Sequence, residues 1–144
     1  MNHEPREILG YAKTVAVVGL SRDPGKPSGH VPYLLQHRGF HVIPVNPSAT
    51  EILGERAYSS LLDIKEPVDV VEVFRPSAEA PAVARQAVEI GARALWLQQG
   101  IKSDEARSIA EAAGLDYVED LCMGKQSIRL NLARTSKVKL SRKG

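Results

Sequence analysis

Short apolar runs rich in β-branched residues alternate along this chain with helical patterns, an order that is typical of βαβ units around a parallel sheet. Five strands are predicted, at residues 14–18, 41–45, 68–74, 92–97 and 116–118. The first is an uninterrupted run, as expected for a strand that is buried on both faces. The second contains Pro44, which lacks an amide hydrogen and therefore indicates an edge-like or locally irregular strand.

Helices are predicted between these strands from serine residues at their starts and glycine residues just past their ends. The expected ranges are 28–39, 77–91 and 103–114, with a short amphipathic helix at 4–12. The segment 48–66 has the least regular pattern, and one helical turn is expected within it, at 59–63. Because crossover connections are right-handed, the predicted fold class is α/β: a Rossmann-like, doubly wound, three-layer domain with a five-stranded, mainly parallel sheet of strand order 3-2-1-4-5.

Composition and charge separate a domain from a tail. The chain has 144 residues, of which 43% are apolar and 25% charged, values that are ordinary for one globular domain. Its net charge is +2, but residues 125–144 contain seven Lys or Arg and no acid, whereas residues 1–124 contain 12 bases and 17 acids. We therefore expect a mildly acidic domain at 1–130 and a basic, weakly ordered tail at 131–144. This distribution of charge does not support a uniformly basic surface that binds nucleic acid.

The same sequence features favour a cytoplasmic location without membrane contact. No run of about 18 apolar residues exists, and the N-terminus has two acids in place of the apolar segment of a signal peptide. The single cysteine, Cys122, rules out an internal disulfide and agrees with a reducing compartment.

The loop after the first strand, residues 19–30, is the strongest candidate for a binding site. It follows a buried strand and opens a helix, which is the setting of a phosphate-binding turn. Gly19 permits close backbone approach, Ser21 and Ser28 can donate hydroxyl hydrogen bonds, and Arg22 and Lys26 add two cations. The alternative interpretation is a long, flexible crossover with no ligand.

The nature of the ligand follows from what this loop lacks. An NAD-binding turn has the pattern Gly-x-Gly-x-x-Gly, and Ser21 and Pro24 stand at the later glycine positions. The second strand ends in residues 45–48, V-N-P-S, without the acid that would grip the ribose hydroxyls of NAD. A neutral turn near two cations favours NADP or coenzyme A over NAD. A Walker P-loop is excluded, because no Gly-Lys-Ser/Thr follows a first glycine at the required distance.

Residues at the ends of the other strands are expected on the same edge of the sheet. Pro47 and the run Phe74-Arg75-Pro76 either present apolar surface to an adenine or simply end their strands. Gln98 and Gln99 follow the fourth strand, and their amides either contact the ligand or cap backbone groups.

Five segments in order resemble one known family, the small stand-alone bacterial CoA-binding proteins, which are similar to the N-terminal CoA-binding domain of the succinyl-CoA synthetase α subunit. The resemblance covers about residues 4–130. The segments are 17–21 (V-V-G-L-S), 45–47 (V-N-P), 73–76 (V-F-R-P), 95–100 (L-W-L-Q-Q-G) and 120–123 (D-L-C-M).

The resemblance implies a Rossmann-like domain whose first loop holds the phosphates of coenzyme A. By position, the residues that it implies for the site are Gly19, Ser21, Arg22, Pro47, Phe74, Pro76, Gln98 and Gln99. Two departures stand out: the first loop is longer, and Ala49 replaces a lysine of the synthetase. Arg22 or Lys26 would then have to hold the 3′-phosphate.

The resemblance also implies a module without catalysis, because the synthetase needs a second domain with a phosphorylatable histidine. The expected function is a CoA-binding or acyl-CoA-binding module, a carrier or sensor that acts on an unknown protein partner. One alternative is an NADP-binding oxidoreductase or redox sensor, and another is an interaction protein that acts through residues 137–143.

Histidine and cysteine offer little further chemistry. The four histidines, at positions 3, 30, 37 and 41, show no metal-ligand spacing. Cys122 either forms a mixed disulfide with the CoA thiol or is a small residue in a tight turn, and both interpretations stay open.

Overall fold

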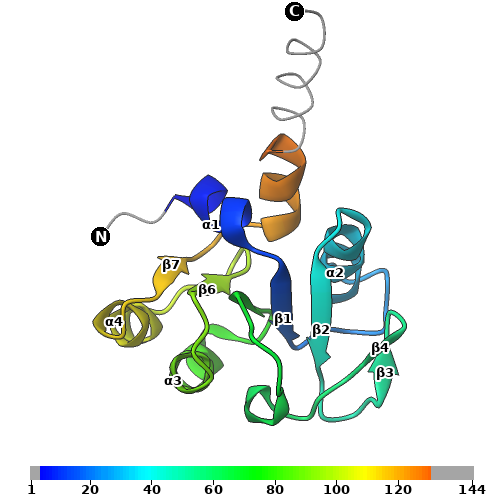
Figure 1. The fold of residues 1–144 in the computed structure, drawn as a ribbon, viewed down its shortest axis with the longest axis horizontal. Coiled ribbons are helices and arrows are strands. Elements are labelled where there is room, and N and C mark those ends of the chain that lie inside the picture. The colour runs from blue at the N-terminus through cyan, green and yellow to red at the C-terminus, as the bar shows by residue number, and fades with distance from the viewer. Residues whose placement is uncertain (1–3, 131–144) are drawn as a thin grey trace, which may run out of the picture.

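Five parallel strands form the central sheet of the computed structural model, which describes residues 4–130 (Figure 1). The strands are β1 (Thr14–Val18), β2 (His41–Val45), β5 (Val70–Val73), β6 (Ala94–Leu97) and β7 (Asp116–Val118). They lie in the order β2-β1-β5-β6-β7, and each pair is parallel. All five predicted strands and the Rossmann-like α/β fold class are confirmed.

The predicted strand order is wrong at one position. The expected order 3-2-1-4-5 places β5 beside β2, whereas β5 pairs with β1, so the observed order in the same numbering is 2-1-3-4-5. The physical reason is Pro44. His41 N donates to Lys13 O on the β1 side, so the alternation of the strand turns the nitrogen of Pro44 to the outer side, where it has no hydrogen to donate. Strand β2 is therefore an edge, as its proline indicated.

The connection from β2 to β5 contains no long helix. It holds a two-stranded hairpin, β3 (Glu51–Ile52) and β4 (Glu55–Arg56), and the 3-10 turn η1 (Leu61–Asp63). The turn lies in the range expected to be helical, and the Ser60 hydroxyl caps it by accepting a hydrogen bond from Leu62 N at 3.2 Å. The hairpin carries no strong strand pattern and was not predicted.

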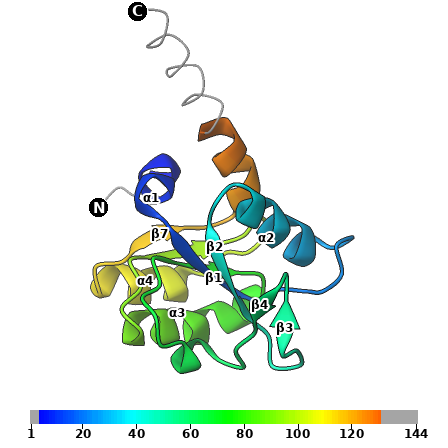
Figure 2. The same ribbon diagram turned by 45° about the vertical axis from the view of Figure 1, so that its right-hand side comes forward.

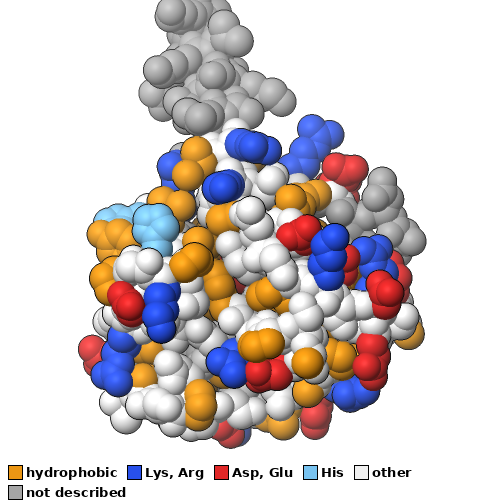
Figure 3. Space-filling model, turned by 180° about the vertical axis from the view of Figure 1, so that it is seen from behind, with side chains coloured by type: hydrophobic (Ala, Val, Ile, Leu, Met, Phe, Trp, Pro, Cys, Tyr) orange, Lys and Arg blue, Asp and Glu red, His pale blue; other side chains and the backbone are white. Residues whose placement is uncertain are grey.

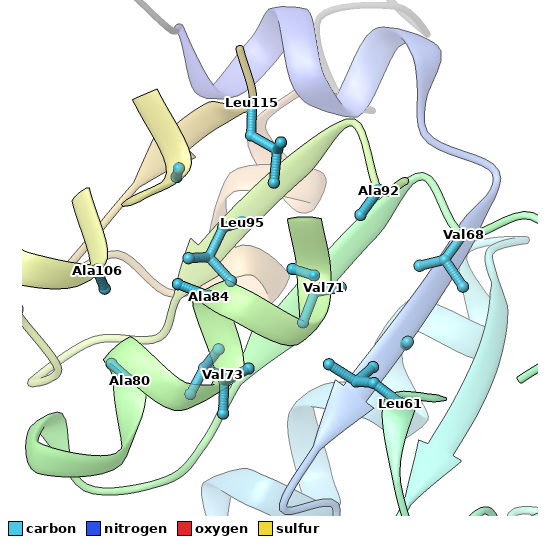
Figure 4. Close-up of a cluster of buried hydrophobic side chains, with 14 of the residues drawn as sticks. Leu61, Val68, Val71, Val73, Ala80, Ala84, Ala92, Leu95, Ala106 and Leu115 are labelled. Atoms are coloured by element: carbon cyan, nitrogen blue, oxygen red, sulfur yellow. The ribbon is translucent and has the colours of Figure 1, made fainter. Parts of the chain in front are cut away.

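Helices cover both faces of the sheet (Figures 1 and 2). On one face lie α1 (Pro5–Tyr11), α2 (Pro27–His37) and the helical residues 123–130, which pack around Leu20, Trp96 and Met123. On the other lie α3 (Ala80–Glu89) and α4 (Asp104–Ala112), over the apolar cluster in Figure 4. Two helix layers and one sheet make the predicted three-layer domain.

The predicted glycine stops are confirmed, since Gly39, Gly91 and Gly114 all have positive φ, but only one of the three predicted serine caps forms. Helix α2 has Lys26 as its N-cap and α3 has Glu79, neither with a side-chain cap. Ser103 caps α4, since its hydroxyl accepts a hydrogen bond from Ala106 N at 3.0 Å. The helix expected at 77–91 consists of the 3-10 turn η2 (Ser77–Glu79) followed by α3. The helical run at 123–130 was not predicted, and the basic tail at 131–144 lies outside the described residues. Among residues 4–130, no helix has the length and apolar character needed to cross a membrane.

One buried side chain conflicts with its surroundings. Glu72 lies in β5 between Val17 of β1 and Trp96 of β6 and is fully buried. Neither carboxyl oxygen has a hydrogen-bond partner in the described part of the chain. Burial raises the pKa of Glu72 from 4.5 to about 8, because the apolar interior disfavours the charged form.

Candidate functional site

A cleft opens outside the carboxyl ends of β1, β2 and β5. From β1 the chain moves to β2 on one side and then to β5 on the other, so the direction of winding reverses between β1 and β5. Open α/β sheets bind ligands at this point. The cleft has a volume of about 840 Å³ and is called the main cleft below. Its lining comes from residues 18–23, 26 and 28 after β1, residues 45–48 after β2, residues 59 and 60, and residues 74, 75, 79, 83 and 86 after β5.

The loop after β1 is held in one conformation by its own hydrogen bonds. Leu20 is fully buried and anchors its start. Ser21 N donates to Ser28 O at 2.9 Å, Asp23 N donates to the Ser21 hydroxyl at 3.0 Å, and Gly25 N donates to the Asp23 carboxylate at 2.9 Å. The hydroxyl hydrogen of Ser21 therefore remains available to a ligand.

A proline inside α2 makes one of these bonds possible. Pro32 lies four residues after Ser28, at the position whose amide would normally donate to the Ser28 carbonyl. Since Pro32 has no amide hydrogen, the Ser28 carbonyl accepts the Ser21 N–H instead. The carbonyl left without its helical hydrogen bond thus holds the loop against α2.

Two glycines let the backbone approach closely. Gly19 has φ +89°, and a Cβ there would lie 2.8 Å from Arg75 Cδ. Gly29 in α2 faces the loop, and a Cβ there would lie 2.9 Å from Ser21 O and would collide with Asp23 O. A side chain at position 29 would force the backbone to shift, whereas at position 19 it would displace the Arg75 side chain and be strained by the positive φ.

The cations of the main cleft differ in what holds them. Arg22 and Lys26 are exposed, and within residues 4–130 neither has an ion-pair partner. Arg75 instead pairs with Glu79 at 2.9 Å, and the hydrogen bond with this carboxylate raises the pKa of Arg75. Two unpaired cations beside the start of α2 suit an anionic group such as a phosphate.

The turn after β2 is joined to the loop after β1. The Asn46 side-chain amide donates to Leu20 O at 2.9 Å, and its oxygen accepts a hydrogen bond from Ser48 N at 2.7 Å. Gly19 N also donates to Val45 O at 3.0 Å. These bonds bring Pro47 into the lining of the main cleft.

Comparison with known proteins identifies the family. The model of the CoA binding domain family matches residues 13–127. The chain belongs to this family. It is 42% identical over 120 residues to the uncharacterized protein YneT of Bacillus subtilis, covering 83% of this chain and 89% of that one. The predicted resemblance to small stand-alone CoA-binding proteins is confirmed.

Two further similarities extend this finding. Over 105 residues the chain is 35% identical to the ADP-forming acetate–CoA ligase II of Archaeoglobus fulgidus, and the match covers 72% of this chain but 16% of the ligase. The structure of cell-free ID.343 from Thermus thermophilus superposes with a TM-score of 0.82 at 39% identity, covering 87% of this chain and 95% of that one. The domain therefore occurs both by itself and as a small part of a larger ligase.

The structure brings most of the predicted site residues together. Those that line the main cleft are Gly19, Ser21, Arg22, Lys26, Ser28, Pro47, Phe74 and Arg75. Pro76 and Gln99 are exposed outside its lining. Gln98 is buried, and its oxygen accepts a hydrogen bond from Met123 N at 3.3 Å. Its side chain therefore satisfies a backbone amide at the start of the helical residues 123–130.

Several residues of the cleft were not predicted. Asn46 follows a strand and precedes a proline, which is a turn signal. Glu79 lies four residues after Arg75, a spacing that favours an ion pair. Ser59, Val83 and Gln86 also line the cleft, and no local pattern marks them because only the fold brings them to it.

The histidines and the cysteine lie elsewhere. His30 and His37 are exposed on α2, and His41 pairs with Glu66 at 3.0 Å. His3 is outside the described residues. Cys122 is half-buried just before the helical residues 123–130 and does not line the main cleft.

Proposed function

We propose that this protein binds coenzyme A, or an acyl-CoA, in the main cleft and acts as a non-catalytic binding, carrier or sensor module. One observation carries the proposal: the lining residues of the main cleft, 18–86, lie wholly within the segment 13–127 that matches the CoA binding domain family.

The chemistry of the cleft agrees with a phosphorylated ligand. The hydroxyls of Ser21 and Ser28, the unpaired side chains of Arg22 and Lys26, and the start of α2 together offer donors and positive charge to the phosphates. Pro47 and Phe74 offer apolar surface for the adenine.

Isothermal titration with coenzyme A, acetyl-CoA, NADP, NAD and ADP in parallel tests the proposal. We expect binding of coenzyme A and acetyl-CoA without binding of NAD. Arg22→Ala should weaken CoA binding by about 10- to 100-fold, because it removes a charge-assisted contact with phosphate. Arg38→Ala is the matched control, since Arg38 is an exposed arginine at the opposite end of α2. This variant should bind coenzyme A as tightly as the wild type does.

Each contrary result has a distinct meaning. Binding of NADP without binding of coenzyme A would overturn the proposal in favour of a redox protein. Equal loss of CoA affinity in Arg22→Ala and Arg38→Ala would show that general positive charge, and not the main cleft, attracts the ligand.

A further inference from the structure

A second pocket lies beside the main cleft, between the start of α2 and the tip of the β3–β4 hairpin. Its volume is about 290 Å³. Ser21 and Arg22 line both cavities, so the two adjoin at the loop that is proposed to hold phosphate. The remaining wall includes Tyr33, Ile52 and Leu53. It is called the side pocket below.

The apolar wall of the side pocket is fixed in place. The ring of Tyr33, which is 49% exposed, packs edge-to-face against His37 with ring centroids 4.4 Å apart. Figure 3 shows histidine side chains next to hydrophobic ones at one edge of the surface. The Gln36 side-chain amide donates to Leu53 O at 2.9 Å and ties the hairpin to α2.

Leu53 has an unusual backbone for its residue type. Its φ of 58° lies in the left-handed region, followed by Gly54 with φ 74°. This pair of angles belongs to a tight hairpin turn in which Asn or Gly normally takes the first position. A leucine there is strained by about 1 kcal/mol, and strained backbone positions cluster at ligand-binding sites. Here the Leu53 side chain lines the side pocket.

We infer that the side pocket binds the pantoyl unit of coenzyme A, an assignment that rests on the proposed function. The pantoyl unit follows the pyrophosphate directly, and it carries two methyl groups, a hydroxyl and an amide. Leu53 and Tyr33 offer the apolar surface that the methyl groups need. The Glu51 carboxylate, also in the wall, can accept a hydrogen bond from the hydroxyl or the amide N–H. The nicotinamide half of NADP has no branched alkyl group at this place, so the side pocket favours coenzyme A.

The test compares coenzyme A with adenosine 3′,5′-bisphosphate, which lacks the pantetheine arm and the phosphate that bears it, by isothermal titration. Leu53→Asn keeps a residue that tolerates the left-handed turn but removes the apolar side chain. We expect it to weaken CoA binding by about tenfold while leaving the affinity for the bisphosphate unchanged. Leu62→Asn is the matched control, because Leu62 is 45% exposed and lines neither cavity. Its affinity for both ligands should equal that of the wild type.

The outcomes separate this inference from the proposed function. Unchanged CoA affinity in Leu53→Asn, with tight binding by the wild type, would overturn the side-pocket assignment alone. An equal loss for both ligands would also overturn it, since the substitution would then act through the phosphate-binding loop. A wild-type protein that binds neither ligand would overturn the proposed function itself.

Discussion

At the scale of single residues, Glu72 shows how burial sets the ionisation state of a side chain. Its carboxyl lies under α1, α2 and the helical residues 123–130, and the loss of solvent is the one cause of its raised pKa. No charged group of those three helices contributes to the shift. With a pKa of about 8, Glu72 is mostly protonated at neutral pH and is tolerated in the core as a neutral acid.

We expect the stability of the protein to fall as the pH rises from about 4.5 to about 8. In this range the unfolded chain has lost the Glu72 proton and the folded protein still binds it, so raising the pH favours unfolding, by roughly 3–5 kcal/mol in total. Urea unfolding at pH 5, 6.5 and 8 measures the effect. Glu72→Gln should remove this part of the slope, whereas the exposed Glu89→Gln should keep it. An identical slope in Glu72→Gln and the wild type would contradict the assignment.

At the scale of elements, the loop after β1 and helix α2 behave as one unit. The helix gives up a hydrogen bond at Pro32, and the freed Ser28 carbonyl holds the loop. Gly29 lets the two backbones meet without a side chain between them. The positions of Arg22 and Lys26 therefore depend on α2 as much as on the loop.

Gly29→Ala should both destabilise the protein and weaken CoA binding. Its new methyl group would collide with the backbone of Asp23, so the loop must move, at a cost of about 1–3 kcal/mol. Urea unfolding and isothermal titration measure the two effects. Gly25→Ala is the control in the same loop, since a Cβ there meets only the Asp23 side chain, at 3.2 Å. If Gly29→Ala bound coenzyme A as tightly as Gly25→Ala, the packing of the loop on α2 would not position the site.

At the scale of the whole molecule, the main cleft exists only when the sheet is assembled. Its walls come from the ends of three strands, β1, β2 and β5, and from α3. The unfolded chain cannot bring these segments together. A ligand of the main cleft therefore binds the folded state alone and stabilises it.

Coenzyme A should accordingly raise the thermal unfolding temperature. At 100 times its dissociation constant it adds about 2.7 kcal/mol to the free energy of unfolding, which corresponds to a rise of roughly 8 °C for a chain of this size. Differential scanning fluorimetry with coenzyme A, and with NAD as the control ligand, measures this. Binding by titration without any thermal shift would mean that the ligand binds the unfolded chain as tightly as the folded protein, which would contradict a site formed only by the assembled sheet.

The sequence by itself determined the elements and the centre of the site. All five strands, the four helices flanking them at 4–12, 28–39, 77–91 and 103–114, and the loop that begins at Gly19 follow from patterns within a few residues of one another. Pro44 even marked β2 as an edge strand. These signals are local because propensity, capping and turn formation act between near neighbours along the chain.

Only the tertiary structure decided which distant segments meet. The hydrogen bond from Met123 to Gln98 and the isolation of Glu72 both depend on contacts between residues far apart in the sequence. The side pocket depends in the same way on the packing of the hairpin against α2. Which of these contacts form depends on packing and hydrogen bonding across the whole fold. Patterns of neighbouring residues in the sequence therefore do not predict them.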